Sequence, residues 1–108
     1  MSGYISVYMT ASSAEEAEAI AKTLVAERLA ACVNILGGIR SVYRWNGAVQ
    51  NDAEVALVAK TRAALFDALS ARVKTLHSYE VPCIVAWPIA AGDAGYLAWI
   101  GQETGREG

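Results

Sequence analysis

The first residues of the chain alternate between apolar and polar side chains. Ile5, Val7 and Met9 form the apolar set, and the residues between them carry hydroxyl groups. A period of two places successive side chains on opposite faces of a strand. Residues 4–10 therefore predict a strand with one buried face, on which Met9 packs in the core.

A helical period replaces this alternation after two serines. Ser12 and Ser13 each have a glutamate three positions later, the spacing of a capping box at the start of a helix. The apolar residues that follow recur at helical spacing: Ala17, Ile20, Ala21, Leu24 and Val25. The pattern predicts a helix over residues 13–29 with one buried face.

The middle of the chain reads as a long hairpin. Residues 30–45 are strand-like, although a glycine pair at positions 37 and 38 indicates a bulge or bend. Asn46 and Gly47 form the strongest short hairpin signal, because a type I′ turn needs positive φ at both central residues. The return strand is predicted over residues 49–60, with an interruption at positions 51 and 52. Its apolar core predicts burial on both faces.

The last third of the sequence predicts a helix, a strand and a short terminal helix. Thr61 is the expected cap of the second helix, which ends near the stretch 76–83. Pro82 disfavours helical geometry in the residue before it, and residues 83–87 predict the last strand. A final helix is expected after Asp93.

This order of elements, β-α-β-β-α-β followed by a helix, predicts an α+β fold. Such a split pair of βαβ units forms an antiparallel four-stranded sheet with two helices on one face. The other face is bare in a single chain, although aromatic residues such as Tyr43 and Trp45 belong to its strands or to the hairpin. We expect this face or the hairpin to contact other subunits, with Tyr43 and Trp45 at the interface.

Composition narrows the class of protein. The chain has 108 residues, 55% hydrophobic and 19% charged, which suits one domain with a single core. A net charge of −2 and the lack of a basic run argue against nucleic acid as a partner. No apolar run approaches the ~20 residues of a membrane span, and the first residues do not resemble a signal peptide. A cytoplasmic location and no membrane partner are therefore expected.

Most of the candidate chemistry falls in residues 76–83. This stretch contains His77, the only histidine of the chain, together with Tyr79, Glu80 and Cys83. It is either a ligand or metal site, or a turn between a helix and a strand that happens to carry these residues. One imidazole is a poor metal site by itself. The sequence has no catalytic triad and no phosphate-binding loop, so we expect no enzymatic activity.

Five stretches together resemble the CutA divalent-cation tolerance family. They are LAACVNI (29–35), SVYRWNG (41–47), EVALVAKT (54–61), LHSYEVP (76–82) and YLAWI (96–100). The resemblance implies one ferredoxin-like domain over residues 1–108, assembled as a homotrimer similar in architecture to the PII signalling proteins. It also implies a role in tolerance of divalent metals, and some members of the family bind copper.

The resemblance also suggests site residues. Members with proposed copper ligands carry a cysteine where this chain has Met9, and two histidines where it has Leu76 and His77. His77 and Met9 are the candidate metal ligands, because a thioether suits Cu(I). A ligand cleft between subunits would be lined by His77, Tyr79, Glu80 and Lys60.

Two functions follow from this resemblance. In the first, the protein binds copper, another divalent metal or a small ligand in these clefts. In the second, it is a PII-like signalling or scaffolding trimer that binds a small anion and a protein partner. Titration with Cu(I), Cu(II) and Zn(II) distinguishes them.

Overall fold

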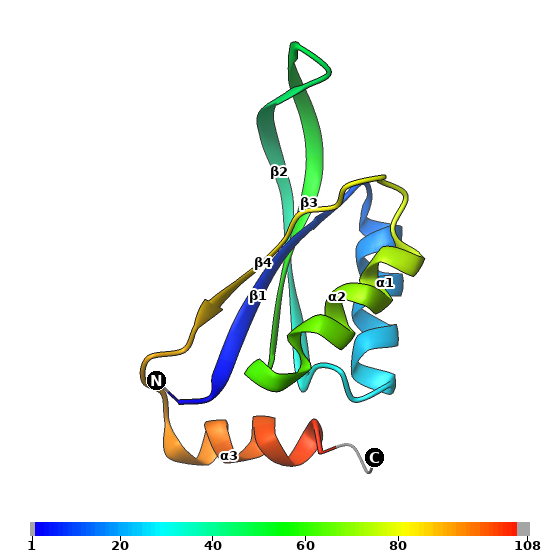
Figure 1. Ribbon diagram of the computed structural model, residues 1–108. Helices are drawn as coiled ribbons and strands as arrows, with labels where there is room; N and C mark the ends of the chain where they lie inside the picture. The colour runs from blue at the N-terminus through cyan, green and yellow to red at the C-terminus, as the bar shows by residue number, and fades with distance from the viewer. Residues whose placement is uncertain (1, 106–108) are drawn as a thin grey trace.

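The computed structural model describes residues 2–105 of the chain (Figure 1). Its strands and helices are β1 (Tyr4–Ala11), α1 (Ala14–Ala26), β2 (Cys32–Trp45), β3 (Ala48–Arg62), α2 (Phe66–Leu76), β4 (Ile84–Pro88) and α3 (Ala94–Glu103). A short 3-10 turn, Ala63–Leu65, precedes α2. The order of elements is the predicted one.

The four strands form one antiparallel sheet in the order β2-β3-β1-β4. Helices α1 and α2 lie together on one face of the sheet, and the β2–β3 hairpin projects well beyond the body (Figure 1). This arrangement confirms the predicted α+β fold with a four-stranded antiparallel sheet.

The core fills the space between the sheet and these two helices. The apolar set of β1, Ile5, Val7 and Met9, is buried as its alternation predicts. Leu57 and Ala59 of β3 join it from the neighbouring strand. The helices contribute Ile20, Leu24, Leu69 and Val73. The opposite face of the sheet, which we call the open face, carries the remaining side chains of each strand.

A bulge in β2 determines which of its side chains reach the open face. The register shifts between Ile35 and Gly37, so that Leu36 is an extra residue opposite β3. Gly37 adopts a positive φ of 99°, which suits a residue without a side chain. As a result Ser41, which pairs with Asp52, lies on the same face as the even-numbered residues of β3. The strand is continuous through the predicted bend.

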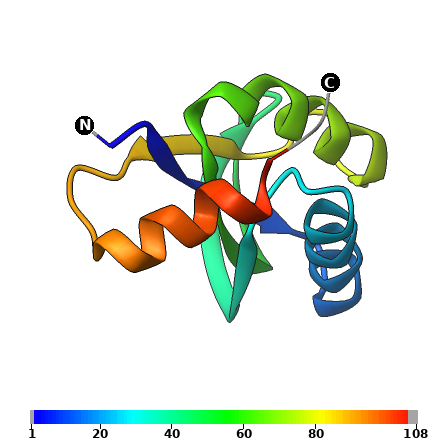
Figure 2. The same cartoon turned by 90° about the horizontal axis from the view of Figure 1, so that it is seen from below.

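Helix α3 crosses the lower end of the sheet (Figure 2). Asp93 caps it by accepting a hydrogen bond from the backbone N–H of Tyr96. Gly101 lets the helix pass close to Tyr4, because a Cβ at this position would lie 2.6 Å from the tyrosine hydroxyl and the tyrosine would have to shift. Arg62 donates to the carbonyl of Gly101 and to the hydroxyl of Thr104, which ties the helix to the end of β3.

Several sequence predictions about element boundaries were wrong. Thr61 does not cap a helix; it lies in β3, paired with Ile5, because β1 continues to offer strand partners as far as Arg62. α1 ends at Ala26, and Arg28 follows in a left-handed conformation with φ 60°. β3 runs through positions 51 and 52 without interruption, since β2 pairs with it there. The last strand begins at Ile84, one residue later than expected, and includes Pro88.

Candidate functional site

A pocket of about 500 Å³ opens on the open face of the sheet. Three strands and the loop between α2 and β4 contribute to it, so residues distant in sequence meet there. Its lining residues are Tyr8, Thr10, Ser41, Tyr43, Trp45, Glu54, Tyr79, Glu80, Val81 and Cys83. Two carboxylates and no lysine, arginine or histidine belong to this set, so the pocket presents negative charge.

Glu54 is the most deeply placed charged group of the pocket. Only 8% of the residue is exposed, although it lies in β3 on the open face. No ion pair found within residues 2–105 involves its carboxylate. Burial raises the pKa of Tyr79 to about 12, and a hydrogen bond to the Glu54 carboxylate adds to this. The Tyr79 phenol thus stays protonated near Glu54.

Two other groups of the pocket, the Tyr43 phenol and the Cys83 thiol, have raised pKa values and stay neutral. The Tyr43 hydroxyl donates to Asp52 Oδ2 at 2.5 Å, and this hydrogen bond raises the pKa of Tyr43. Burial, together with the nearby Glu54 carboxylate, raises the pKa of the Cys83 thiol. Cys83 is therefore not an activated thiolate, since a reactive cysteine needs a lowered pKa.

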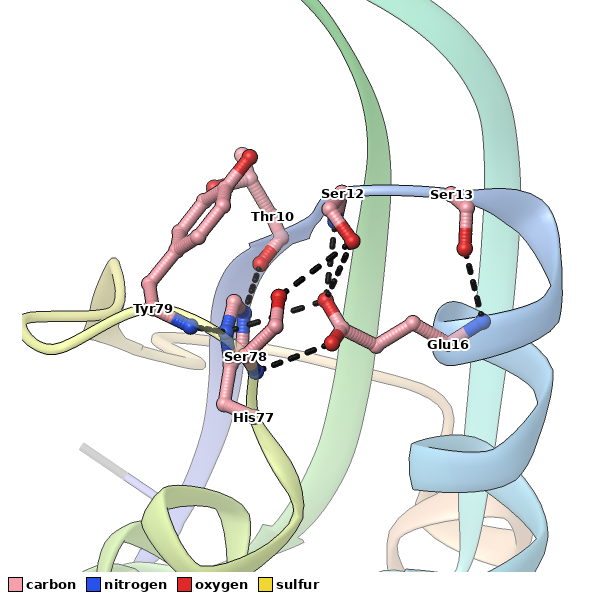
Figure 3. Close-up of polar contacts among 7 residues, drawn as sticks. All are labelled: Thr10, Ser12, Ser13, Glu16, His77, Ser78 and Tyr79. Atoms are coloured by element: carbon pink, nitrogen blue, oxygen red, sulfur yellow. Dashed lines mark hydrogen bonds and ion pairs between the residues drawn. The ribbon is translucent and has the colours of Figure 1, made fainter.

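His77 does not line the pocket, although its ring contacts the backbone of two residues that do, Thr10 and Tyr79. Its side chain is fully buried. The ring Nε2 lies 2.7 Å from the Thr10 carbonyl oxygen, and Nδ1 lies 3.0 Å from the backbone nitrogen of Tyr79 (Figure 3). A carbonyl can only accept and an amide N–H can only donate, so Nε2 carries the proton and Nδ1 accepts. Both ring nitrogens are used, and neither has a lone pair left for a metal.

Glu16 connects the loop that follows α2 to the start of α1. Its carboxylate accepts hydrogen bonds from the Ser12 backbone N–H at 2.9 Å and from the Ser78 backbone N–H at 2.9 Å (Figure 3). Glu16 Oε1 also lies 3.7 Å from His77 Nδ1. Burial alone would raise the pKa of Glu16, but the hydrogen bonds from Ser12 and Ser78 outweigh it and lower the pKa. Ser13 caps the helix by accepting from the Glu16 N–H, as the capping-box spacing predicts.

Comparison with known proteins decides the family. The model of the CutA1 divalent ion tolerance protein family matches residues 5–103. The chain belongs to this family. A divalent-cation tolerance protein CutA of Thermus thermophilus is 54% identical over 99 residues, which cover 92% of this chain and 96% of that protein.

Other relatives of this CutA1 family member extend the comparison. The chloroplastic CutA 1 of rice is 48% identical over 93% of this chain, and the alignment covers 56% of the rice protein. Among solved structures, the periplasmic CutA of Archaeoglobus fulgidus superposes with a TM-score of 0.92 at 43% identity, covering 94% of this chain and 99% of that one. The Thermus thermophilus structure also gives 0.92, at 52% identity.

The structure brings together only part of the predicted site. Tyr79 and Glu80 line the pocket, and so do Tyr43 and Trp45, which were predicted as interface residues. His77 is not a lining residue, and its ring contacts the backbone carbonyl of Thr10.

Two predicted residues lie elsewhere in the CutA1 chain. Met9 is fully buried in the core, on the face of the sheet that the helices cover. Lys60 pairs with Ser6 and Cys32 toward the other end of the sheet, and its amine donates to Asn34. Within one chain, neither side chain lines the pocket.

Glu54 is the charged site residue that sequence reasoning missed. It directly precedes the continuous apolar run of β3, which is an unusual position for a carboxylate. That position was the available signal. Tyr8, Thr10 and Ser41 were also missed. Strand pairing brings them to one pocket, and the sequence alone does not reveal that pairing.

Proposed function

We propose that this CutA1 family member is a homotrimer that acts in tolerance of divalent metals by binding a cation in the open-face pocket. The assembly would turn each pocket into a cleft between subunits. The observation that carries the proposal is the buried Glu54 carboxylate, which faces the pocket without a cationic side chain among the lining residues. A buried charge without a partner is costly, so the site favours a cation as its ligand.

The same charge pattern argues against the small-anion alternative. A PII-like module that binds an anion needs basic side chains or backbone N–H groups aimed at its ligand. The pocket lining includes Glu54 and Glu80 but no basic residue. We therefore favour cation binding over the signalling function.

The chain offers a partial set of metal donors. Glu54, Glu80 and Cys83 supply two carboxylates and a thiol in one pocket, and the soft sulfur of a cysteine suits copper once the metal displaces its proton. Within residues 2–105, however, no three His, Cys, Asp or Glu side chains lie close enough to form a metal site. Copper or another divalent ion would take further ligands from water or from a neighbouring subunit. His77 and Met9 would join only after rearrangement of the core.

Exposed aromatic residues on the open face support the trimer. Trp45 is 43% exposed and Trp87 is 52% exposed, and both lie on the face that no helix of the α1–α2 layer covers. Apolar patches of this kind mark contact surfaces. The projecting hairpin gives each chain an arm with which to reach a neighbour (Figure 1).

Calorimetric titration with Cu(I), Cu(II) and Zn(II) tests the function. We expect binding by the assembled protein, and a loss of about tenfold or more in affinity for Glu54→Gln, which corresponds to about 1.4 kcal/mol. Glu15→Gln removes an exposed carboxylate of α1 and is the matched control, with unchanged affinity. Binding that Glu54→Gln leaves intact, while His77→Ala abolishes it, would assign the metal to His77 instead.

Light scattering tests the assembly separately. A mass of about three times that of the chain supports the homotrimer. A monomer at micromolar concentration would contradict it.

The family is named for tolerance and not for a reaction, which agrees with a binding protein rather than an enzyme. No helix of residues 2–105 is long and apolar enough to cross a bilayer. The cytoplasmic location stays a prediction, because the rice relative is named chloroplastic and the Archaeoglobus fulgidus structure periplasmic.

A further inference from the structure

The pocket has aromatic walls in addition to its negative charge. Tyr8, Tyr43, Trp45 and Tyr79 all line it. The face of an aromatic ring is electron-rich and attracts organic cations, with tryptophan and tyrosine the most effective. A bare metal ion gains little from such walls, because hard cations prefer oxygen ligands in defined geometry.

The charge at the base of the pocket calls for a partner. The Tyr79 phenol lies near the Glu54 carboxylate and can occupy at most one of its several acceptor positions. A phenol neutralises none of the negative charge. Because no ion pair found within residues 2–105 includes Glu54, the remaining acceptor positions suit a ligand that brings both positive charge and N–H donors.

The size of the pocket points beyond a single ion. A volume of about 500 Å³ falls within the roughly 300–1,000 Å³ of pockets that hold small organic molecules. β2 places Trp45 six residues beyond Ile39, the residue that pairs with Glu54, so the pocket extends along the hairpin from a carboxylate toward an aromatic side chain. A ligand that fills it needs a charged end and an apolar body.

We propose that the pocket binds a protonated organic amine with an apolar or aromatic body. The ammonium group pairs with Glu54, and the body packs against Tyr43 and Trp45. This inference rests on the proposed function, because it assigns a ligand class to the same cleft. It extends that function, because the ligand is an organic cation rather than a metal.

Three probes of similar size and different charge test the proposal by calorimetry at neutral pH. They are 2-phenylethylamine, which is protonated, 2-phenylethanol, which is neutral, and 3-phenylpropanoate, which is negative. We expect the amine to bind about tenfold or more tightly than the alcohol, and the acid not to bind. Glu54→Gln should remove the preference for the amine, whereas Trp45→Leu should weaken the amine and the alcohol alike. Glu15→Gln is the control.

Each outcome either supports or overturns the inference. Equal affinities for amine and alcohol overturn it, and so does the absence of amine binding. A crystal structure of the assembly with a neighbour's lysine or arginine paired with Glu54 also overturns it, because the charge would already be matched. The wild-type comparison needs no variant, so it decides the matter even if Glu54→Gln fails to fold.

The metal titration separates this inference from the proposed function. Retained Zn(II) or copper binding without amine binding contradicts the inference alone. Amine binding without metal binding contradicts the metal-binding function alone and leaves the organic cation as the ligand of the cleft.

Discussion

Replacement of His77 by alanine should destabilise the protein and loosen the wall of the pocket. The imidazole donates from Nε2 to the Thr10 carbonyl and accepts from the Tyr79 N–H at Nδ1, and its side chain is fully buried. His77→Ala leaves both backbone groups without these partners. A buried donor or acceptor that loses its partner costs about 1–3 kcal/mol, so for these two groups we expect a loss of about 2–6 kcal/mol in the free energy of unfolding.

Urea denaturation measures this loss. The protomer concentration must be held fixed, because unfolding of an oligomer depends on concentration. Lys74→Ala is the control. It changes an exposed residue near the end of α2, the helix that His77 follows, and should alter the unfolding free energy by about 0.5 kcal/mol or less. Hydrogen exchange at the Tyr79 amide gives a local readout, and we expect it to be faster in His77→Ala.

Three results would contradict this reasoning. A change in unfolding free energy as small as that of Lys74→Ala would show that the imidazole does not hold the turn. Unchanged protection of the Tyr79 amide would show that its hydrogen bond to Nδ1 is dispensable. A 15N spectrum of the ring with the proton on Nδ1 would contradict the assignment of the tautomer.

The remaining predictions concern Glu16 and Thr61. The pKa of Glu16 lies below its ordinary value of 4.5 in the folded protein, so its stabilising contribution is present above that value and is lost as the pH falls through the folded-state pKa. Urea titrations at pH values on either side should show a smaller acid destabilisation for Glu16→Gln than for the wild type; equal acid sensitivity would contradict this. The Thr61 hydroxyl is buried and has no hydrogen-bond partner among the described residues. Thr61→Val should therefore raise the unfolding free energy by about 1 kcal/mol, and a decrease would show that the hydroxyl has a partner.

Local pattern was enough to predict most of the secondary structure. The alternation around Val7 and the helical spacing around Ile20 depend on which residues a single element buries, and that information lies within a few positions. The turn at Asn46 and Gly47 was also predicted correctly, since both residues adopt positive φ. Thr61 was misassigned because a threonine before an apolar run suits a cap and a strand equally, and the pairing with β1 decides between them.

The candidate site was less predictable for a physical reason. Its lining comes from three strands and a loop, and strand register and the bulge determine which side chains share a face. His77 attracted attention as the only histidine, yet its partners are the backbone groups of Thr10 and Tyr79, which no residue type in the sequence indicates. Glu54 became a candidate only when its burial was known.

The extra residue in β2 has a consequence for how the hairpin can be altered. Because side chains alternate, Leu36 reverses the orientation of every residue between the bulge and the turn. If β2 kept this residue but paired with β3 in a regular ladder without the bulge, Val42 and Arg44 would face the pocket in place of Ser41 and Tyr43 and would put a cation where the site now carries negative charge. A chimaera that carries the β2–β3 hairpin of a relative on the rest of this chain must therefore match the bulge before it matches any residue of the pocket.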